Sequence, residues 1–144
     1  LLGDYMRYLL IIFLSLTLSK VLLAEDVTVE MLNKLEKRSM VFSQEIVRIN
    51  PGDTVFWQAT DKGHNVEFMV APDNIKFKSK MHKNAGYTFT IPGIYTYKCT
   101  PHVSTGMVGV VIVGGDLSNI NDALAGNYPG QSKEIIHELL SKYN

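Results

Sequence analysis

Cysteine is almost absent from this sequence, since Cys99 is the only one among 144 residues. A single cysteine cannot form an internal disulfide. In an oxidising compartment, a lone thiol is a liability unless the protein protects it or uses it. Coordination of a metal ion would give Cys99 such a use.

An excess of charge of either sign is also missing. The chain has 14 basic and 14 acidic residues, and 19% of it is charged against 46% hydrophobic. Because there is no general basic field, the sequence does not predict binding to nucleic acid. The length and the composition are those of one globular domain.

Long apolar runs are lacking except near the N-terminus. Met6 and Arg7 precede an apolar run from Tyr8 to Leu18, and Ala24 stands before an acidic pair at 25–26. This order predicts a secretory signal peptide over residues 1–24, with Met6 as its expected start and cleavage after Ala24. The alternative is a membrane anchor, which is disfavoured because the run is shorter than the ~20 apolar residues that a span needs.

The expected mature chain, residues 25–144, is nearly neutral. Cleavage would remove two of the 14 basic residues and one of the 14 acidic ones, which leaves 12 and 13 and a net charge near −1. We expect an exported monomer with no membrane contact after cleavage.

Apolar residues alternate along most of this mature chain, as they do in strands. Val47, Ile49, Val55 and Trp57 fall on odd positions on either side of residues 50–53, where Pro followed by Gly favours a type II turn. A second Pro-Gly pair at 92–93 separates predicted strands at 87–89 and 94–99, and an apolar run at 108–113 ends at two glycines. Short antiparallel strands with one buried face each predict an all-β sandwich.

After residue 115 the apolar period becomes that of a helix. Asp116 is predicted to cap a short helix that buries Leu117, Ile120 and Leu124, and Ser132 to cap a second helix with apolar residues through 143. We expect both helices to cover the sandwich, and the alternative is that one of them binds a partner.

Four residues carry the chemistry of a soft metal site. Cys99, His102 and Met107 place a thiolate, an imidazole and a thioether within nine residues, at the junction of two predicted strands. His64 lies in the connection after the strand at 55–57 and supplies a second imidazole. Two His and one Cys in a trigonal site with a weak axial Met bind copper in preference to harder metals.

Six segments of the chain, some of them far from these four residues, carry a family resemblance. They are Met31-Leu-Asn-Lys34, Met40-Val-Phe42, Asn50-Pro-Gly-Asp-Thr-Val55, Asp61-Lys-Gly-His-Asn-Val-Glu67, Phe77-Lys-Ser-Lys80 and Lys98-Cys-Thr-Pro-His102. Together they closely resemble the pseudoazurins, a family of cupredoxins. The resemblance implies a Greek-key sandwich of eight strands over residues 25–144, with two C-terminal helices. It also implies a periplasmic electron carrier whose one type 1 copper ion shuttles between Cu(II) and Cu(I).

The resemblance further implies roles for residues around the ligands. Asn65 resembles a residue that locks the ligand loop, and Met40 resembles one that packs near the exposed histidine ring. A ring of lysines would surround a hydrophobic docking surface at the edge of His102 and steer an acidic partner toward it. The matching lysines are Lys34, Lys62, Lys80 and Lys98. Copper nitrite reductases and cytochromes are partners of the kind that this family uses.

Pro101 lies two residues after the predicted thiolate. Proline has no backbone N–H, so the thiolate is expected to lack one hydrogen-bond donor there. Such a bond would stabilise Cu(I) more than Cu(II), and its absence is expected to lower the reduction potential.

One-electron transfer is predicted in preference to catalysis. An enzyme would need a second metal centre or an open coordination position, and only His82 and His137, both expected to face solvent, remain as spare imidazoles. The alternative function is that of a copper chaperone or storage protein. Such proteins usually carry several exchangeable ligands in a flexible segment, and Met69 and Met81 are too scattered for this.

Overall fold

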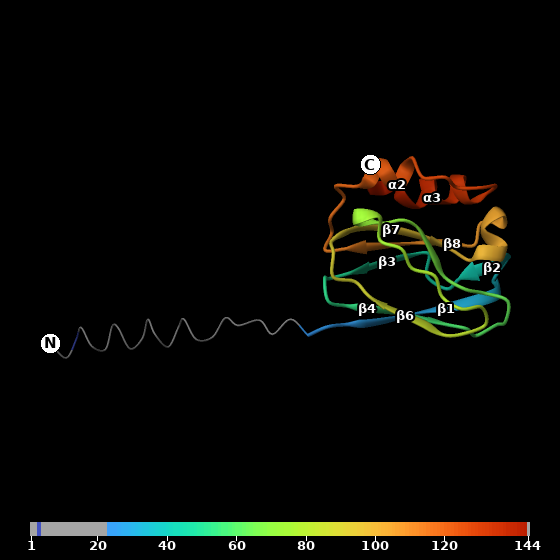
Figure 1. Ribbon diagram of the computed structural model, residues 1–144, viewed down its shortest axis with the longest axis horizontal. Helices are drawn as coiled ribbons and strands as arrows, with labels where there is room; N and C mark the ends of the chain where they lie inside the picture. The colour runs from blue at the N-terminus through green and yellow to red at the C-terminus, as the bar shows by residue number, and fades with distance from the viewer. Residues whose placement is uncertain (1–2, 4–22, 144) are drawn as a thin grey trace.

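Two sheets pack face to face, and two helices cover one of them (Figure 1). The computed structural model describes Gly3 and residues 23–143. The strands are β1 (Asp26–Leu35), β2 (Arg38–Phe42), β3 (Ile46–Ile49), β4 (Thr54–Gln58), β5 (Glu67–Val70), β6 (Ala85–Thr88), β7 (Gly93–Lys98) and β8 (Val108–Val113). The helices are α2 (Ile120–Leu124) and α3 (Ser132–Leu140), with 3-10 turns η1 (Pro72–Asn74), η2 (Thr100–Thr105) and η3 (Ser141–Tyr143). The predicted signal peptide lies outside the described residues, except for Gly3, Leu23 and Ala24.

One sheet has the strand order β2-β1-β4-β6, and the other has the order β3-β8-β7-β5. The predicted sandwich of eight strands is confirmed. The expectation that all strands pair antiparallel is wrong, because β1 pairs with β4 and β3 with β8 in parallel, two of the six pairings. The turns after β3 and after β6 carry the chain from one sheet to the other, so consecutive strands there do not pair.

The turn between β3 and β4 is held by a buried carboxylate. Asp53 is 3% exposed, and its side chain accepts the backbone N–H groups of Asn50 at 2.7 Å and of Glu25 at 2.8 Å. Gly52 has a φ of 99°, which the predicted Pro-Gly turn requires at this position. Asp53 therefore fastens the turn and the start of β1 together.

Two apolar cores form on the two faces of the β7–β8 sheet. Between the sheets, the ring of Tyr97 lies 5.2 Å from Trp57 and 4.9 Å from Phe42, measured between centroids. On the outer face, Ile136 and Leu140 of α3 are fully buried in a second core with apolar residues of β8. Every residue of β8 is buried because both of its faces are covered.

The helices cover the sheet as expected, but the predicted caps are wrong. The α2 helix begins only at Ile120, and the Asp116 carboxylate accepts the backbone N–H of Ser118 at 2.8 Å in a turn before it. Ser132 is already the first residue of α3, and its hydroxyl donates to the carbonyl of Pro129. Short polar side chains bond to nearby backbone in turns as readily as at caps, so they do not by themselves mark where a helix begins.

Gly109 in β8 leaves room for the buried ring of Tyr97. A Cβ atom at position 109 would lie 2.3 Å from Tyr97 Cζ. We expect Gly109→Ala to lower the free energy of unfolding by about 1–3 kcal/mol through overpacking, as measured by urea denaturation. Gly86→Ala is the matched control, because its Cβ would also meet an aromatic ring, that of Phe56 at 2.9 Å, but Phe56 is 45% exposed and lies outside both cores. Equal losses in the two variants would contradict this interpretation.

Candidate metal centre

Three of the predicted ligands meet at one end of the sandwich. Cys99 Sγ lies 3.6 Å from His64 Nδ1 and 3.4 Å from His102 Nδ1. The three donor atoms all lie within 4.8 Å of one another. His64 and Cys99 are fully buried, and His102 is half-buried. Among residues 23–143, no other group of three His, Cys, Asp or Glu side chains comes together in this way.

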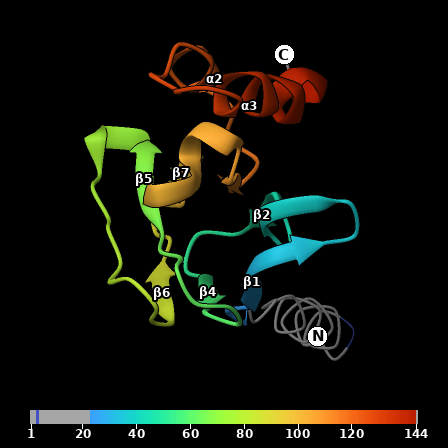
Figure 2. The same ribbon diagram turned by 90° about the vertical axis from the view of Figure 1, so that its right-hand side faces the viewer.

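Backbone hydrogen bonds close the loop that carries three of the four predicted ligands, Cys99, His102 and Met107. The N–H of Cys99 donates to the carbonyl of Met107 at 2.9 Å, and the N–H of Met107 donates to the carbonyl of His102 at 3.1 Å. Gly106, with a φ of 95°, ends the η2 turn that makes this return path. Met107 is fully buried in the same core as Cys99. Figure 2 looks onto this end and shows the orange η2 segment between α3 and the β1–β2 hairpin.

Asn33 orients the buried histidine, a role that the sequence alone did not indicate. His64 Nε2 lies 2.9 Å from Asn33 Oδ1, so Nε2 carries the proton and donates it. The bare Nδ1 then faces Cys99, as a metal-binding imidazole requires. Asn33 belongs to the segment 31–34 quoted above, but it is 31 residues from His64 in the chain.

The two spare histidines do more than face solvent. His82 is exposed, but its ring Nδ1 accepts the backbone N–H of Gly63 at 2.7 Å, and the backbone N–H of His82 donates to the carbonyl of His64 at 3.0 Å. His137 is half-buried, and its Nε2 donates to the carbonyl of Leu124 at 2.8 Å. The expectation that His137 faces solvent is therefore wrong. His82 holds the segment that carries the predicted ligand His64.

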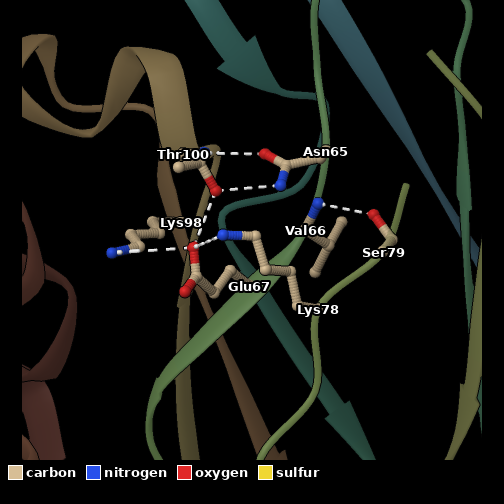
Figure 3. Close-up of polar contacts among 7 residues, drawn as sticks. All are labelled: Asn65, Val66, Glu67, Lys78, Ser79, Lys98 and Thr100. Atoms are coloured by element: carbon tan, nitrogen blue, oxygen red, sulfur yellow. Dashed lines mark hydrogen bonds and ion pairs between the residues drawn. The ribbon is translucent and has the colours of Figure 1, made fainter. Parts of the chain in front are cut away.

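Asn65 joins the two segments that carry the ligands. Its side chain accepts the backbone N–H of Thr100 at 2.7 Å and donates to the Thr100 hydroxyl at 2.8 Å (Figure 3). Because Asn65 follows His64 and Thr100 follows Cys99, this pair of hydrogen bonds fixes the distance between the two segments. The locking role that the resemblance implies for Asn65 stays a prediction, and these are the hydrogen bonds through which it would act.

Burial sets the protonation of the two buried donors. Burial raises the pKa of the Cys99 thiol, although the backbone N–H groups of Asn65 and His102 favour the thiolate. Burial, and then the charge of His102, lower the pKa of His64 against the opposing effect of Asp61. The imidazole of His64 is therefore neutral at pH 7, ready to bind a cation, whereas Cys99 must lose a proton when a metal binds.

Two imidazole nitrogens, a sulfur and a nearby thioether make a donor set that suits copper. The family model for copper-binding proteins of the plastocyanin/azurin family matches residues 29–114. The chain belongs to this family. As the sequence predicts, this cupredoxin is a copper protein.

Pseudoazurins are among its most similar relatives. Pseudoazurin of Paracoccus pantotrophus is 41% identical over 119 residues, which span 81% of this chain and 82% of the relative. The crystal structure of pseudoazurin from Methylobacterium extorquens AM1 superimposes with a TM-score of 0.78 at 34% identity and covers 83% of this chain and 100% of its own. That of Hyphomicrobium denitrificans gives 0.77 at 32% identity, with coverage of 82% and 98%. The resemblance to pseudoazurins is confirmed.

The remaining predicted residues lie around this site in different ways. Met40 is half-buried against the core that contains Cys99 and Met107. Pro101 lies in the first turn of η2, directly after Thr100. Three of the four predicted docking lysines are exposed, and Lys98 is half-buried in an ion pair. The exposed ones are Lys34, Lys62 and Lys80.

Replacing Pro101 tests the missing donor at the sulfur. Cys99 precedes η2 as its N-cap, and the N–H groups of the second and third residues of such a turn face the N-cap side chain. We expect Pro101→Ala to add a hydrogen bond to the thiolate and to raise the reduction potential of the copper-loaded protein by about 40–90 mV, equivalent to about 1–2 kcal/mol for one electron.

Voltammetry of the copper-loaded variant measures this effect. Pro51→Ala is the control, because Pro51 packs beside Gly114 at the far end of β8. An unchanged or lowered potential in Pro101→Ala at an intact blue site would show that Pro101 only stiffens the loop.

Proposed function

We propose that this protein is a type 1 blue-copper electron carrier in which His64, Cys99, His102 and Met107 hold the metal. The observation that carries the proposal is the approach of two imidazole Nδ1 atoms to within 3.6 Å of one buried cysteine sulfur. Bound copper would supply a Cu(II)/Cu(I) couple.

The residues of the chain keep the donor atoms in place. Asn33 fixes the ring of His64, Asn65 ties that segment to the loop after Cys99, and the strands on either side hold the loop ends. A site prepared in this way needs little movement when its charge changes. Three of the four ligands are fully buried, and the half-buried His102 gives electrons the shortest way to the surface.

The burial of the donors favours a carrier over a chaperone or storage protein. A protein that hands copper on needs ligands that leave readily, but here they lie within a packed core with the backbone of the loop closed around them. With four ligands in place, no position is left for a substrate, so we propose a carrier without catalytic activity.

We also propose that residues 1–24 are a signal peptide and that residues 25–144 act in the periplasm. Leu23 is 80% exposed, whereas the backbone N–H of Glu25 is held by Asp53 and β1 begins at Asp26. The first strand thus begins at the second residue after the predicted cleavage site. Within residues 23–143, no helix has the length and the apolar character to cross a membrane.

The colour of the copper-loaded protein tests the ligand assignment. We expect the Cu(II) form to show intense visible absorption from thiolate-to-copper charge transfer, and Cys99→Ser to abolish it because a hydroxyl cannot replace the soft donor. Thr100→Ser serves as a control that keeps the sulfur. A visible spectrum of Cys99→Ser with the intense band still present would refute the assignment.

Charge reversal near the ligands tests the docking surface. Lys62 is two residues from His64, and Lys98 adjoins Cys99. We expect Lys62→Glu and Lys98→Glu to slow electron transfer to an acidic partner, such as a copper nitrite reductase or a cytochrome, by about three- to tenfold at low salt. Lys133→Glu on α3 is the control. Stopped-flow rates equal to wild type across an ionic-strength series would place docking elsewhere.

A further inference from the structure

The carboxylate of Glu67, the first residue of β5, contacts three side chains (Figure 3). Glu67 Oε2 accepts a hydrogen bond from the Thr100 hydroxyl at 2.7 Å and lies 3.3 Å from Lys78 Nζ and 3.7 Å from Lys98 Nζ. Burial alone would raise the pKa of Glu67, but the hydrogen bond from Thr100 and the two lysines together lower it. The side chain is therefore charged at neutral pH.

Glu67 determines the direction of the hydrogen bonds between the two ligand segments. A threonine hydroxyl has one proton to donate. Because Thr100 donates it to Glu67, its oxygen can accept the amide of Asn65, while the Thr100 N–H donates back to Asn65 Oδ1. Glu67 thus supports the contacts between the residue after His64 and the residue after Cys99.

The same carboxylate limits the charge of two lysines. The side chain of Lys98 is only 26% exposed, and that of Lys78 is 58% exposed. A lysine that is paired with a carboxylate attracts an acidic partner less strongly than a free one does. An acidic surface would therefore compete with the Glu67 carboxylate for ion pairs with these two lysines.

We propose that Glu67 is a positioning residue that both holds the Asn65–Thr100 contacts in place and sets how much positive charge Lys78 and Lys98 present to an acidic partner. This inference rests on the proposed function, which assigns Lys98 to partner docking, and it adds Lys78, the second lysine beside Glu67. It makes Glu67, which coordinates nothing itself, a determinant of partner affinity.

Two substitutions separate the two roles. Glu67→Gln keeps an oxygen that can accept from Thr100 but removes the charge, whereas Glu67→Leu removes both. Glu45→Gln is the matched control, because Glu45 is also in an ion pair, with Arg38 at 2.6 Å, and its side chain is 23% exposed against 25% for Glu67. All three substitutions change the net charge equally.

Amide hydrogen exchange of metal-free protein reports the positioning role. We expect the Thr100 amide to exchange about tenfold faster in Glu67→Leu than in wild type, through loss of its supporting hydrogen bonds, and to stay near wild type in Glu67→Gln and Glu45→Gln. The Phe89 amide, which donates to the backbone carbonyl of Asp53 at 2.9 Å, is the internal reference. Unchanged protection of Thr100 in Glu67→Leu would overturn this half of the proposal.

Binding of a poly-glutamate peptide reports the charge role. We expect metal-free Glu67→Gln to bind about threefold more tightly than Glu45→Gln at low salt, with the difference lost at high salt. Adding Lys78→Ala and Lys98→Ala to each of the two Gln variants should remove this difference in peptide affinity. Equal affinities for the two Gln variants would overturn the proposal. Both readouts use metal-free protein, so a failure of the blue-copper assignment would show separately, as a wild-type protein without colour.

Discussion

Burial of the Cys99 sulfur is the constraint on which the rest of the site depends. In an apolar core a thiolate is unfavourable, and burial accordingly raises the pKa of this thiol. Positive charge must therefore arrive with the metal, and the two imidazoles must already face the sulfur when it does. Asn33, His82 and Asn65 hold this arrangement through hydrogen bonds from three different segments.

The sandwich places these segments side by side. Cys99 directly follows β7 at the end of the sheet. Because β7 pairs with β8, Met107, which directly precedes β8, lies opposite Cys99. Alternation along β7 turns Tyr97 and Cys99 into the core. Thr96 faces the other way and is nevertheless buried, because Tyr128 and the helices cover that face. The helices thus allow a β7–β8 pair that is buried on both faces except at Lys98.

The candidate ligands could be proposed from the sequence because three of them share one short loop and the fourth follows a clear strand. Cys99, His102 and Met107 are recognisable by spacing and chemistry alone. Apart from the role of Asn65, which the resemblance implies, the supporting contacts were missed because their partners are distant in the chain, as with Asn33 and His64. A lone asparagine or glutamate carries no signal by itself. The helix starts and the parallel pairings were missed because packing between elements decides them, and local pattern does not.

Cyclic voltammetry of the copper-loaded protein, repeated in the presence of a Cu(I) chelator, tests the central claim most directly. An electron carrier with this buried and preorganised site should take up one copper per chain and show a reversible one-electron couple. The blue colour should bleach on reduction and return fully on reoxidation, cycle after cycle. Transfer of copper to the chelator on the first reduction, with loss of the colour, would contradict the account and indicate a protein that delivers copper.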